Sequence, residues 1–391
     1  MGATDHGGAR TLDFLTVSKW LILAEKGRLL RWGGDLRRFH VFRRLASSTH
    51  SPVYRSFTAP MLEASLPPVK PGAARGRAHV ASAEFLAPDA LALVRQRGRL
   101  TALDVHDDQI LQITSLGLDV DPVRLAEIRS TRDASLDAFR WHVANSDSFA
   151  RLAGLERRRV IIAPNGTDPA KVLPGPWPET PTIGLVSGAA PGRGIELVVA
   201  AAELLRVELP DLQVLLALAS TGPESEQYLA DLRGRLASSS WIRFATAPYD
   251  QLGALLGEAT VLCVPHPPSP YWDAVQPIKL FDSMAAGRPI AATPRTATAA
   301  VVEHAHAGVV ARGESATDFA QAIGPLLGER ALAERLGRNA RQAVVRDYDW
   351  QVISSHLSAT LQLRTDPFFV PRTFARTAWR RVRPAKSPGA P

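Results

Sequence analysis

The chain has 391 residues, of which 46% are hydrophobic and 21% charged, so it is long enough for two domains with their own cores and is not disordered by composition. Its net charge is +8, and its one cysteine, Cys263, excludes a disulfide within the chain and is expected to be a buried strand thiol. No apolar run approaches the roughly 20 residues of a transmembrane helix and no signal peptide is recognised, so the expected location is the cytoplasm.

The positive charge is concentrated in two segments. Residues 19–55 hold nine lysines and arginines against two acids, and residues 364–391 hold seven against one. This distribution favours one anionic surface partner, either a charged acceptor or the inner face of a membrane, where the protein would be peripheral. A solvated arginine-rich surface is the alternative. Nucleic acid is not expected, since no helix-turn-helix, zinc-finger or RNA-binding aromatic motif is present.

In the first half of the chain, short β-type runs alternate with helical patterns. The glycine pair Gly33-Gly34 precedes a stretch that predicts a helix, and the "DVD" tripeptide at 119–121 is expected to cap a long helix rather than to bind a metal. Strands are predicted at 11–18, 51–60, 78–85, 99–108, 142–146 and 158–166.

A proline-rich segment separates the two halves. Residues 167–181 hold five prolines in fifteen positions, too many for a packed helix or strand, and are expected to form a linker. The predicted organisation is therefore a first domain at 1–166, the linker, a second domain at 182–345, a helix at 346–363 and a basic tail at 364–391.

Strand and helix alternate regularly in the second domain. Each of its continuous apolar runs precedes a helical pattern, which indicates a parallel sheet covered on both faces. The predicted fold class is thus α/β, with two doubly wound domains whose ligands bind beyond the carboxyl ends of the strands. The five runs are 182–188, 212–220, 241–247, 260–266 and 288–293.

One short helix carries charge in an apolar stretch. It is expected over residues 277–286, between Pro277 and Gly287, with Lys279, Asp282 and Ala286 on one stripe of the helix. A phosphate at its first turn would meet exposed N–H groups and the Lys279 ammonium, and Asp282 would accept hydrogen bonds from a sugar diol. A salt bridge between Lys279 and Asp282 on a half-exposed helix is the alternative.

Several ordered motifs resemble the GT-B fold glycosyltransferases of family 4, which are retaining and use nucleotide-sugars. They are the glycine-rich loop that ends in Arg193-Gly194, the turn "PNG" at 164–166 and the run "PIKLFDSMAAGRPIAATP" from Pro277. The resemblance covers about 155–363. It implies two Rossmann-like domains that face each other across a cleft, with the donor on the second domain, the acceptor on the first, and a last helix that returns to the first domain.

The resemblance also implies roles for particular residues. Arg193 and Lys279 would neutralise the leaving diphosphate without a metal ion or cofactor, and His106 would face the donor sugar. For His106, a surface histidine beside Asp107 and Asp108 is the alternative. The residues expected to bind the donor are Gly188, Gly192, Arg193, Gly194, Lys279, Leu280 and Asp282, with Gly33 and Gly34 from the first domain.

Three positions depart from the family pattern. Asp282 replaces the usual glutamate that binds the ribose, Gly188 stands where an arginine is common, and Ala274 stands where a second glutamate is common. Asp273, one residue away, is expected to point elsewhere.

The expected function is transfer of a sugar from a nucleoside diphosphate-sugar to a glycan, lipid-linked or small-molecule acceptor. A nucleotide-sugar epimerase or phosphorylase of the same fold, or a non-catalytic partner subunit that binds nucleotide-sugar, are the alternatives.

Overall fold

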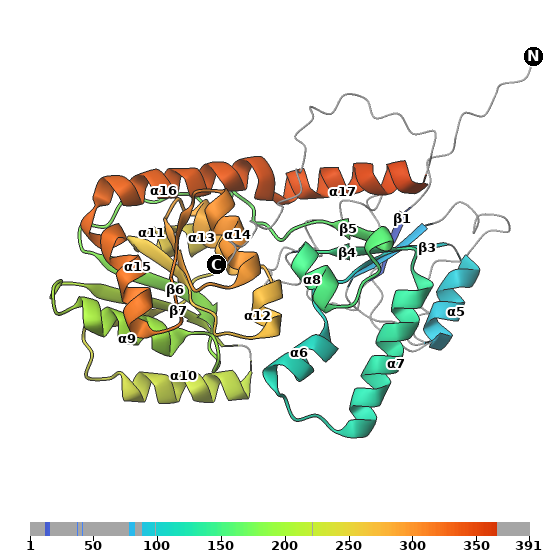
Figure 1. Ribbon diagram of the computed structural model, residues 1–391, viewed down its shortest axis with the longest axis horizontal. Coiled ribbons are helices and arrows are strands. Elements are labelled where there is room, and N and C mark those ends of the chain that lie inside the picture. Colours follow the sequence, from blue (N-terminus) through green and yellow to red (C-terminus); the bar gives the residue numbers. More distant parts are fainter. Residues whose placement is uncertain are drawn as a thin grey trace, which may run out of the picture.

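The computed structural model describes residues 12–15, 37, 41, 78–82, 88–97, 99–220 and 222–365. Two parallel sheets with helices around them lie beside each other in this part of the chain (Figure 1). Gly33, Gly34, the strand expected at 51–60 and all of the basic tail beyond residue 365 lie outside the described residues.

The first sheet has five parallel strands in the order β1-β2-β3-β4-β5, which is also their chain order. Its strands are β1 Leu12–Leu15, β2 Ala78–Ser82, β3 Arg99–Asp104, β4 Trp141–Ala144 and β5 Val160–Ile162. Its helices are α5 Pro88–Arg97, α6 Gln109–Leu116, α7 Pro122–Ala138, α8 Asp147–Leu152 and the 3₁₀ turn η3 Arg157–Arg159.

The second sheet has six parallel strands in the order β11-β10-β9-β6-β7-β8. The order reverses between β6 and β9, and in doubly wound sheets a ligand crevice forms at such a reversal. The strands are β6 Thr182–Gly188, β7 Gln213–Ala219, β8 Ile242–Ala245, β9 Val261–Val264, β10 Ile290–Ala292 and β11 Gly308–Val310. The helices are α9 Ile195–Leu205, α10 Pro223–Arg235, η4 Tyr249–Gln251, α11 Leu252–Gly257, α12 Pro270–Ala274, α13 Ile278–Ala285, α14 Thr296–His304, α15 Ala316–Gly328, α16 Arg330–Ala343, the π-helical segment η5 Val344–Tyr348 and α17 Trp350–Thr365.

Apolar packing explains the arrangement of these layers. Buried aliphatic side chains of β6, β7 and β9 pack against α9 and α15, while those of β9 and β10 pack against α13 and α14. Cys263 lies in β9, 3% exposed, and burial raises the pKa of its thiol, so the prediction of a buried strand thiol is confirmed. None of the described helices has both the length and the apolar character needed to cross a membrane.

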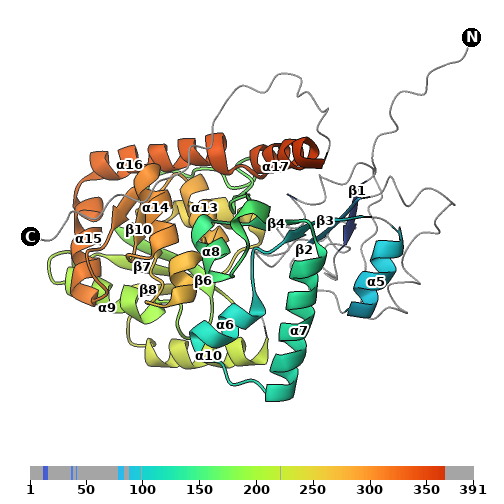
Figure 2. The same cartoon turned by 45° about the vertical axis from the view of Figure 1, so that its right-hand side comes forward.

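The last helix belongs spatially to the first domain. Trp350, Ile353 and Leu357 of α17 pack in one cluster with Ala102 and Val143 of the first sheet. Figures 1 and 2 both show α17 lying along β4 while α16 covers the second domain. The chain therefore crosses between the domains twice, once before β6 and once before α17.

The "DVD" tripeptide caps a helix. The Asp121 side chain accepts a hydrogen bond from the Arg124 N–H at 3.0 Å, and Pro122 occupies the first turn of α7. The capping prediction is confirmed.

Helix α13 begins and ends near the predicted positions, with Pro277 as N-cap and Gly287 at a φ of 70°. The alternative of a half-exposed helix is contradicted, because Asp282 and Ala286 are fully buried and Lys279 alone of this stripe is partly exposed. The reason is that α16 and η5 cover this helix, and Arg341 of α16 donates to the Ala285 carbonyl at 2.9 Å.

Candidate functional site

The candidate site lies where the carboxyl ends of the two sheets meet. The loops after β6 and β9 come from the second domain, and the loop after β3 comes from the first. Helix α12 lies between them, packed against α6 and α8 on one side and α14 on the other, as Figure 1 shows. This helix was not predicted, because five residues are too few for a helical period to be visible.

The glycine-rich loop is shaped by close contact with β9. Gly192 and Gly194 have φ angles of 70° and 74°, and Gly194 is the N-cap of α9. A Cβ on Gly194 would lie 1.8 Å from the Pro265 carbonyl oxygen, whereas Gly188 and Gly192 have open space around that position. The N-terminus of α9 has no side-chain cap, so its backbone N–H groups are available to an anion.

Arg193 extends from this loop over an aromatic pair. Its guanidinium carbon lies 4.9 Å from the centre of the Trp272 ring, and Trp272 stacks on His266 with ring centres 3.9 Å apart. Burial lowers the Arg193 pKa, while Tyr271 and Asp107 oppose that shift. Trp272 and His266 were missed by the sequence analysis, in which "HPPSPYW" carried no motif.

A second arginine lies beyond the end of β10. Arg295 is 5% exposed, its Nη1 lies 3.2 Å from Asp273 Oδ1, and its Nη2 contacts Glu314. Burial together with the charges of Arg193 and Arg295 lowers the pKa of His266 to about 3, so this ring is neutral at pH 7. The ends of β6, β9 and β10 thus gather two cations around a neutral histidine. Arg295 was also missed from sequence.

Ala274, at the position where a second glutamate is common in the family, and its neighbour Asp273 have different surroundings. Asp273 points to Arg295 with 41% of its side chain exposed, and Ala274 is buried. The Ala274 carbonyl accepts a hydrogen bond from Ser146 Oγ of the first domain at 2.8 Å. Ala274 therefore makes an interdomain contact through its backbone.

Lys279 and Leu280 open α13 with different environments. Lys279 is half-buried in the first turn, and its charge opposes the rise that burial causes in the pKa of Asp282. The Leu280 side chain is fully buried in the core of the second domain, and its N–H donates to the Pro277 carbonyl at 3.1 Å. The Leu280 side chain is therefore a packing residue, and its contact with a donor stays a prediction.

Asp282 is fully buried and has a partner in the linker. Its Oδ1 accepts a hydrogen bond from Thr167 Oγ1 at 2.7 Å, with the Tyr249 hydroxyl at 3.4 Å. Its Oδ2 is buried without a partner among the described residues. Burial raises the Asp282 pKa, although Lys279 and the two hydroxyl groups act against that shift. Thr167 and Tyr249 were not predicted as site residues.

The first domain contributes a buried chain of charges. His106 is 8% exposed, and its Nδ1 lies 2.6 Å from Asp104 Oδ2. Arg37 donates to the same carboxylate from Nε at 3.0 Å and from Nη2 at 2.9 Å. Burial would raise the Asp104 pKa, but the charges of Arg37 and His106 hold it below its usual value.

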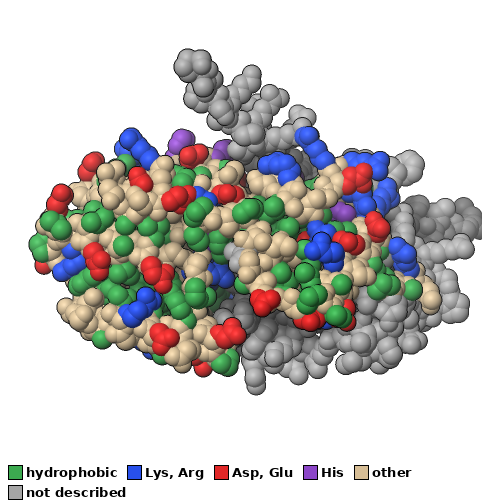
Figure 3. Space-filling model, turned by 60° about the horizontal axis from the view of Figure 1, so that its bottom comes forward, with side chains coloured by type: hydrophobic (Ala, Val, Ile, Leu, Met, Phe, Trp, Pro, Cys, Tyr) green, Lys and Arg blue, Asp and Glu red, His purple; other side chains and the backbone are tan. Residues whose placement is uncertain are grey.

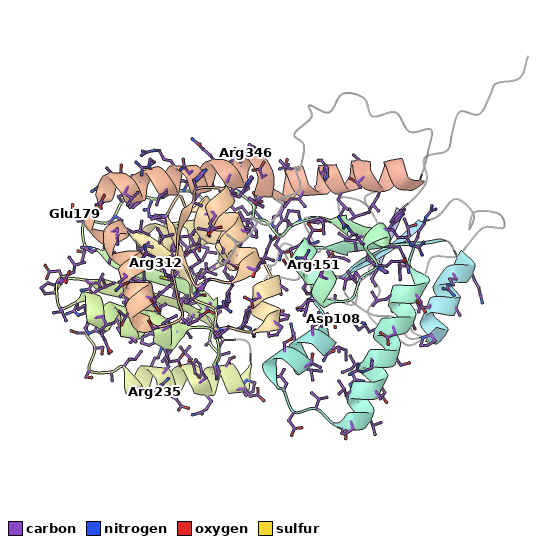
Figure 4. The ribbon with its side chains drawn as sticks, in the orientation of Figure 1. Asp108, Arg151, Glu179, Arg235, Arg312 and Arg346 are labelled. Atoms are coloured by element: carbon purple, nitrogen blue, oxygen red, sulfur yellow. The ribbon has the colours of Figure 1, made fainter. Side chains whose placement is uncertain are left out.

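The alternative of a surface histidine beside Asp107 and Asp108 is contradicted. Asp108 caps α6 and pairs with Arg132 at 2.6 Å, in the region labelled in Figure 4. Asp107 instead faces the second domain, where the Tyr271 hydroxyl donates to it at 3.0 Å. Neither carboxylate has a hydrogen bond with the His106 ring.

Further contacts join the two sides of the site. Gln112 of α6 donates to the Tyr271 hydroxyl at 3.1 Å. The Asn165 amide nitrogen donates to the Gln276 carbonyl at 2.7 Å, while its oxygen accepts from Arg37 Nη1 at 3.1 Å. Asn165 thus connects the support of His106 to the loop before α13.

The described residues also bear on metal binding and on surface charge. Among the described residues, no three His, Cys, Asp or Glu side chains lie close enough together to hold a metal ion. On the face shown in Figure 3, acidic and basic side chains of the described residues are interspersed over both domains.

Comparison with known proteins finds a protein family and individual proteins whose sequences are similar to part of this chain. Residues 180–329 match the family described as "Glycosyl transferases group 1". D-inositol 3-phosphate glycosyltransferase of Nocardia farcinica is 28% identical over 217 residues, which are 51% of this chain and 47% of that protein. Phosphatidyl-myo-inositol mannosyltransferase of Mycolicibacterium smegmatis is 26% identical over 203 residues, 50% of each chain. The chain thus spans about half the length of the curated relatives it matches.

Among solved structures, Anabaena Alr3699/HepE in complex with UDP has a similar fold. The TM-score is 0.65 at 16% sequence identity, and the match covers 90% of this chain and 99% of that one. At this identity the likeness concerns the fold.

Proposed function

We propose that this chain, which has the GT-B fold and carries a glycosyl transferases group 1 domain at residues 180–329, transfers a sugar from a nucleoside diphosphate-sugar to an acceptor. The donor would bind to the second domain and the acceptor to the first. The observation that carries the proposal is the position of Arg193, held over Trp272 at the uncapped N-terminus of α9 and beside the reversal of strand order. A diphosphate fits an oriented helix end with a cation next to it.

In the proposed reaction, the bond between the sugar C1 and the diphosphate oxygen breaks, and a bond from C1 to the acceptor oxygen forms on the same face of the sugar. The acceptor proton passes to the leaving diphosphate. Arg193 and Lys279 stabilise the negative charge that develops there. His106, with its Nδ1 held by Asp104, donates or accepts a hydrogen bond at the sugar through its other nitrogen. The nucleotide-sugar is a co-substrate, and the proposal requires no metal ion or cofactor.

We further propose an anionic or lipid-linked acceptor. Two observations support this proposal. The curated relatives are named as a D-inositol 3-phosphate glycosyltransferase and a phosphatidyl-myo-inositol mannosyltransferase. In addition, residues 19–55 and 364–391 carry an excess of basic side chains. Such a protein would work at the inner face of a membrane as a peripheral enzyme.

Thermal unfolding with a panel of uridine, guanosine and adenosine diphosphate-sugars tests donor binding. A donor at 100 times its Kd stabilises the folded chain by about 2.7 kcal/mol. We expect the diphosphate-sugars of one of these nucleosides to raise the Tm. Arg193→Ala or Lys279→Ala should weaken their binding about tenfold or more, because each substitution removes a charge-assisted contact. Arg235→Ala is the control, since Arg235 is an exposed residue of α10 paired with Glu196. A panel in which no nucleotide-sugar changes the Tm contradicts the proposal.

A non-catalytic partner subunit is the second candidate, and Gly188 and Ala274 are the observations that favour it. Neither residue carries charge, and a side chain at 188 would meet open space. Product analysis separates the candidates. A transferase yields a glycosylated acceptor, an epimerase converts the nucleotide-sugar without any acceptor, and a partner subunit binds the donor without turnover.

A further inference from the structure

Thr167 lies where the two connections between the domains touch. Its N–H donates to the Tyr348 carbonyl at 3.0 Å, and the Trp350 N–H donates to the Thr167 carbonyl at 3.1 Å. Thr167 and Asp349 form an isolated parallel bridge. The backbone of this residue therefore joins the linker to the segment that enters α17.

The side chain of the same residue reaches the second domain. Its hydroxyl donates to Asp282 Oδ1 at 2.7 Å and lies 3.0 Å from the Tyr249 hydroxyl. Thr167 and Asp282 are both fully buried. A threonine with only a packing role would not need this contact, because valine has the same shape.

The second oxygen of Asp282 points to a ligand. Oδ2 is buried and has no partner among the described residues, and buried polar atoms in folded proteins are nearly always paired. A sugar hydroxyl could supply the missing donor. Because Oδ2 is buried in the structure, a ligand reaches it only when the groups that cover it move.

We infer that Thr167 is a positioning residue for the donor nucleoside. Its hydroxyl holds Oδ1 of Asp282 so that Oδ2 is left for a ribose hydroxyl, and its backbone ties this carboxylate to the crossing between the domains. The inference rests on the proposed function, because it requires a nucleoside diphosphate at α13. It predicts that nucleoside binding and the relative position of the domains are coupled through one side chain.

The charged and titratable groups that face Asp282 are few. Lys279 comes from the first turn of the same helix, and Tyr249 comes from η4. Lys279 and the hydroxyl groups of Thr167 and Tyr249 all favour the ionised carboxylate, whereas burial favours the protonated one. Removal of the Thr167 hydroxyl therefore raises the pKa of Asp282 further.

The test compares Thr167→Val, Thr167→Ser and Thr182→Val in the full chain by calorimetric titration with UDP, ADP and GDP between pH 5 and pH 8.5. Thr182 is the matched control. It is a buried threonine at the start of β6, the end of that strand away from the candidate site, and its hydroxyl donates to the Thr180 carbonyl at 3.0 Å. We expect Thr167→Val to lose about tenfold in affinity at pH 8. Thr167→Ser, which keeps the hydroxyl, should remain within about threefold of the wild type.

The pH dependence distinguishes positioning from simple packing. In Thr167→Val the loss of affinity on acidification should begin at a higher pH than in the wild type, and in Thr182→Val it should not move. If Thr167→Val and Thr182→Val bind alike at all pH values, the inference is overturned while the proposed function stands. If the wild type binds none of the three nucleotides, the proposed function itself has failed.

A second variant covers the case in which Thr167→Val does not fold. Tyr249→Phe removes the other hydroxyl near Oδ1 and keeps the ring. It should move the acidic limb of nucleotide binding in the same direction, and an unchanged limb overturns the inference.

Discussion

Asp104 and Asp282 are both fully buried aspartates, one in each domain, but their surroundings shift the pKa in opposite directions. Arg37 and His106 hold the Asp104 pKa below its usual value in spite of burial. Burial raises the Asp282 pKa in spite of Lys279. The difference arises because the Arg37 guanidinium bonds directly to Asp104, whereas Asp282 has only hydroxyl partners.

These opposite shifts predict opposite pH slopes for two substitutions. Asp282 binds a proton more readily in the folded chain than in the unfolded one, so its contribution to stability falls as the pH rises from about 4 through its raised folded pKa. Asp104 binds a proton less readily when folded, so the stability it contributes is present above about pH 4 and is lost as the pH falls through its lowered folded pKa.

We therefore expect Asp282→Asn to become more stable relative to the wild type as the pH rises from 4.5 to 8. Asp104→Asn should be destabilised at pH 8, and its deficit should shrink on acidification. The free energy of unfolding in urea at several pH values measures both, at about 1.4 kcal/mol per unit of pKa difference. If stability changes with pH in the same way in both variants, the pKa direction assigned to Asp282 or to Asp104 is wrong.

Sequence reasoning found the site residues that stand in local motifs and missed those that depend on distant contacts. Arg193 stands between Gly192 and Gly194, of which Gly194 lies too close to the Pro265 backbone for a side chain, and Lys279 follows a proline at a helix start. Arg37 and Thr167 carry no local signal, because their partners are Asp104 and Asp282, far away in the chain. Only the fold brings those pairs together.

At the scale of elements, Gly192 and Gly194 have nearly the same φ but different surroundings. A Cβ at Gly192 meets nothing, whereas at Gly194 it meets the Pro265 backbone. We expect Gly192→Ala to cost about 1 kcal/mol through backbone conformation alone. Gly194→Ala should cost at least about 2 kcal/mol more and should weaken nucleotide binding, since the loop must move away from β9.

Urea unfolding and nucleotide titration of the two glycine variants measure these effects. If both variants lose the same stability, the contact between the loop and Pro265 does not constrain the loop.

The alternation of elements was predictable where strands and helices are long, and less so where they are short. The run at 182–188 predicted β6 to the residue, and the α13 limits were right within one position. Helix α12 and strand β11 were missed, because five and three residues show no period. The burial of Asp282 and Ala286 in α13 was not predicted, since it depends on coverage by α16 and by Thr167, which the local pattern does not contain.

At the scale of the whole molecule, two arginines fasten the linker to the second domain. Arg341 of α16 donates to the Pro169 carbonyl and the Val172 carbonyl, each at 2.7 Å. Arg288 donates to the carbonyls of Gly175 and Pro176, and Trp177 lies over its guanidinium at 4.4 Å. The linker residues after 168 are thus part of the second domain, so relative motion of the domains is expected around Thr167.

Arg341→Leu tests this role. It leaves the carbonyls of Pro169, Val172 and Ala285 without their donor, and we expect a loss of about 3 kcal/mol. Amide hydrogen exchange at 169–176 should speed up. The control is Arg338→Leu on the same helix, whose side chain is 65% exposed and pairs with Glu334. Equal effects of the two substitutions would show that the linker is held by other contacts.

The burial of Cys263 has a practical consequence for measuring how the two domains move. The chain has no other cysteine, and a thiol inside β9 with a raised pKa reacts slowly with maleimides and methanethiosulfonates. Cysteines introduced at Arg151 on α8 and Arg235 on α10, two exposed positions in different domains (Figure 4), would therefore take spin labels or fluorophores selectively. The distance between such labels, followed while a candidate nucleotide is added, would report any change in the relative position of the two domains in the otherwise unaltered chain.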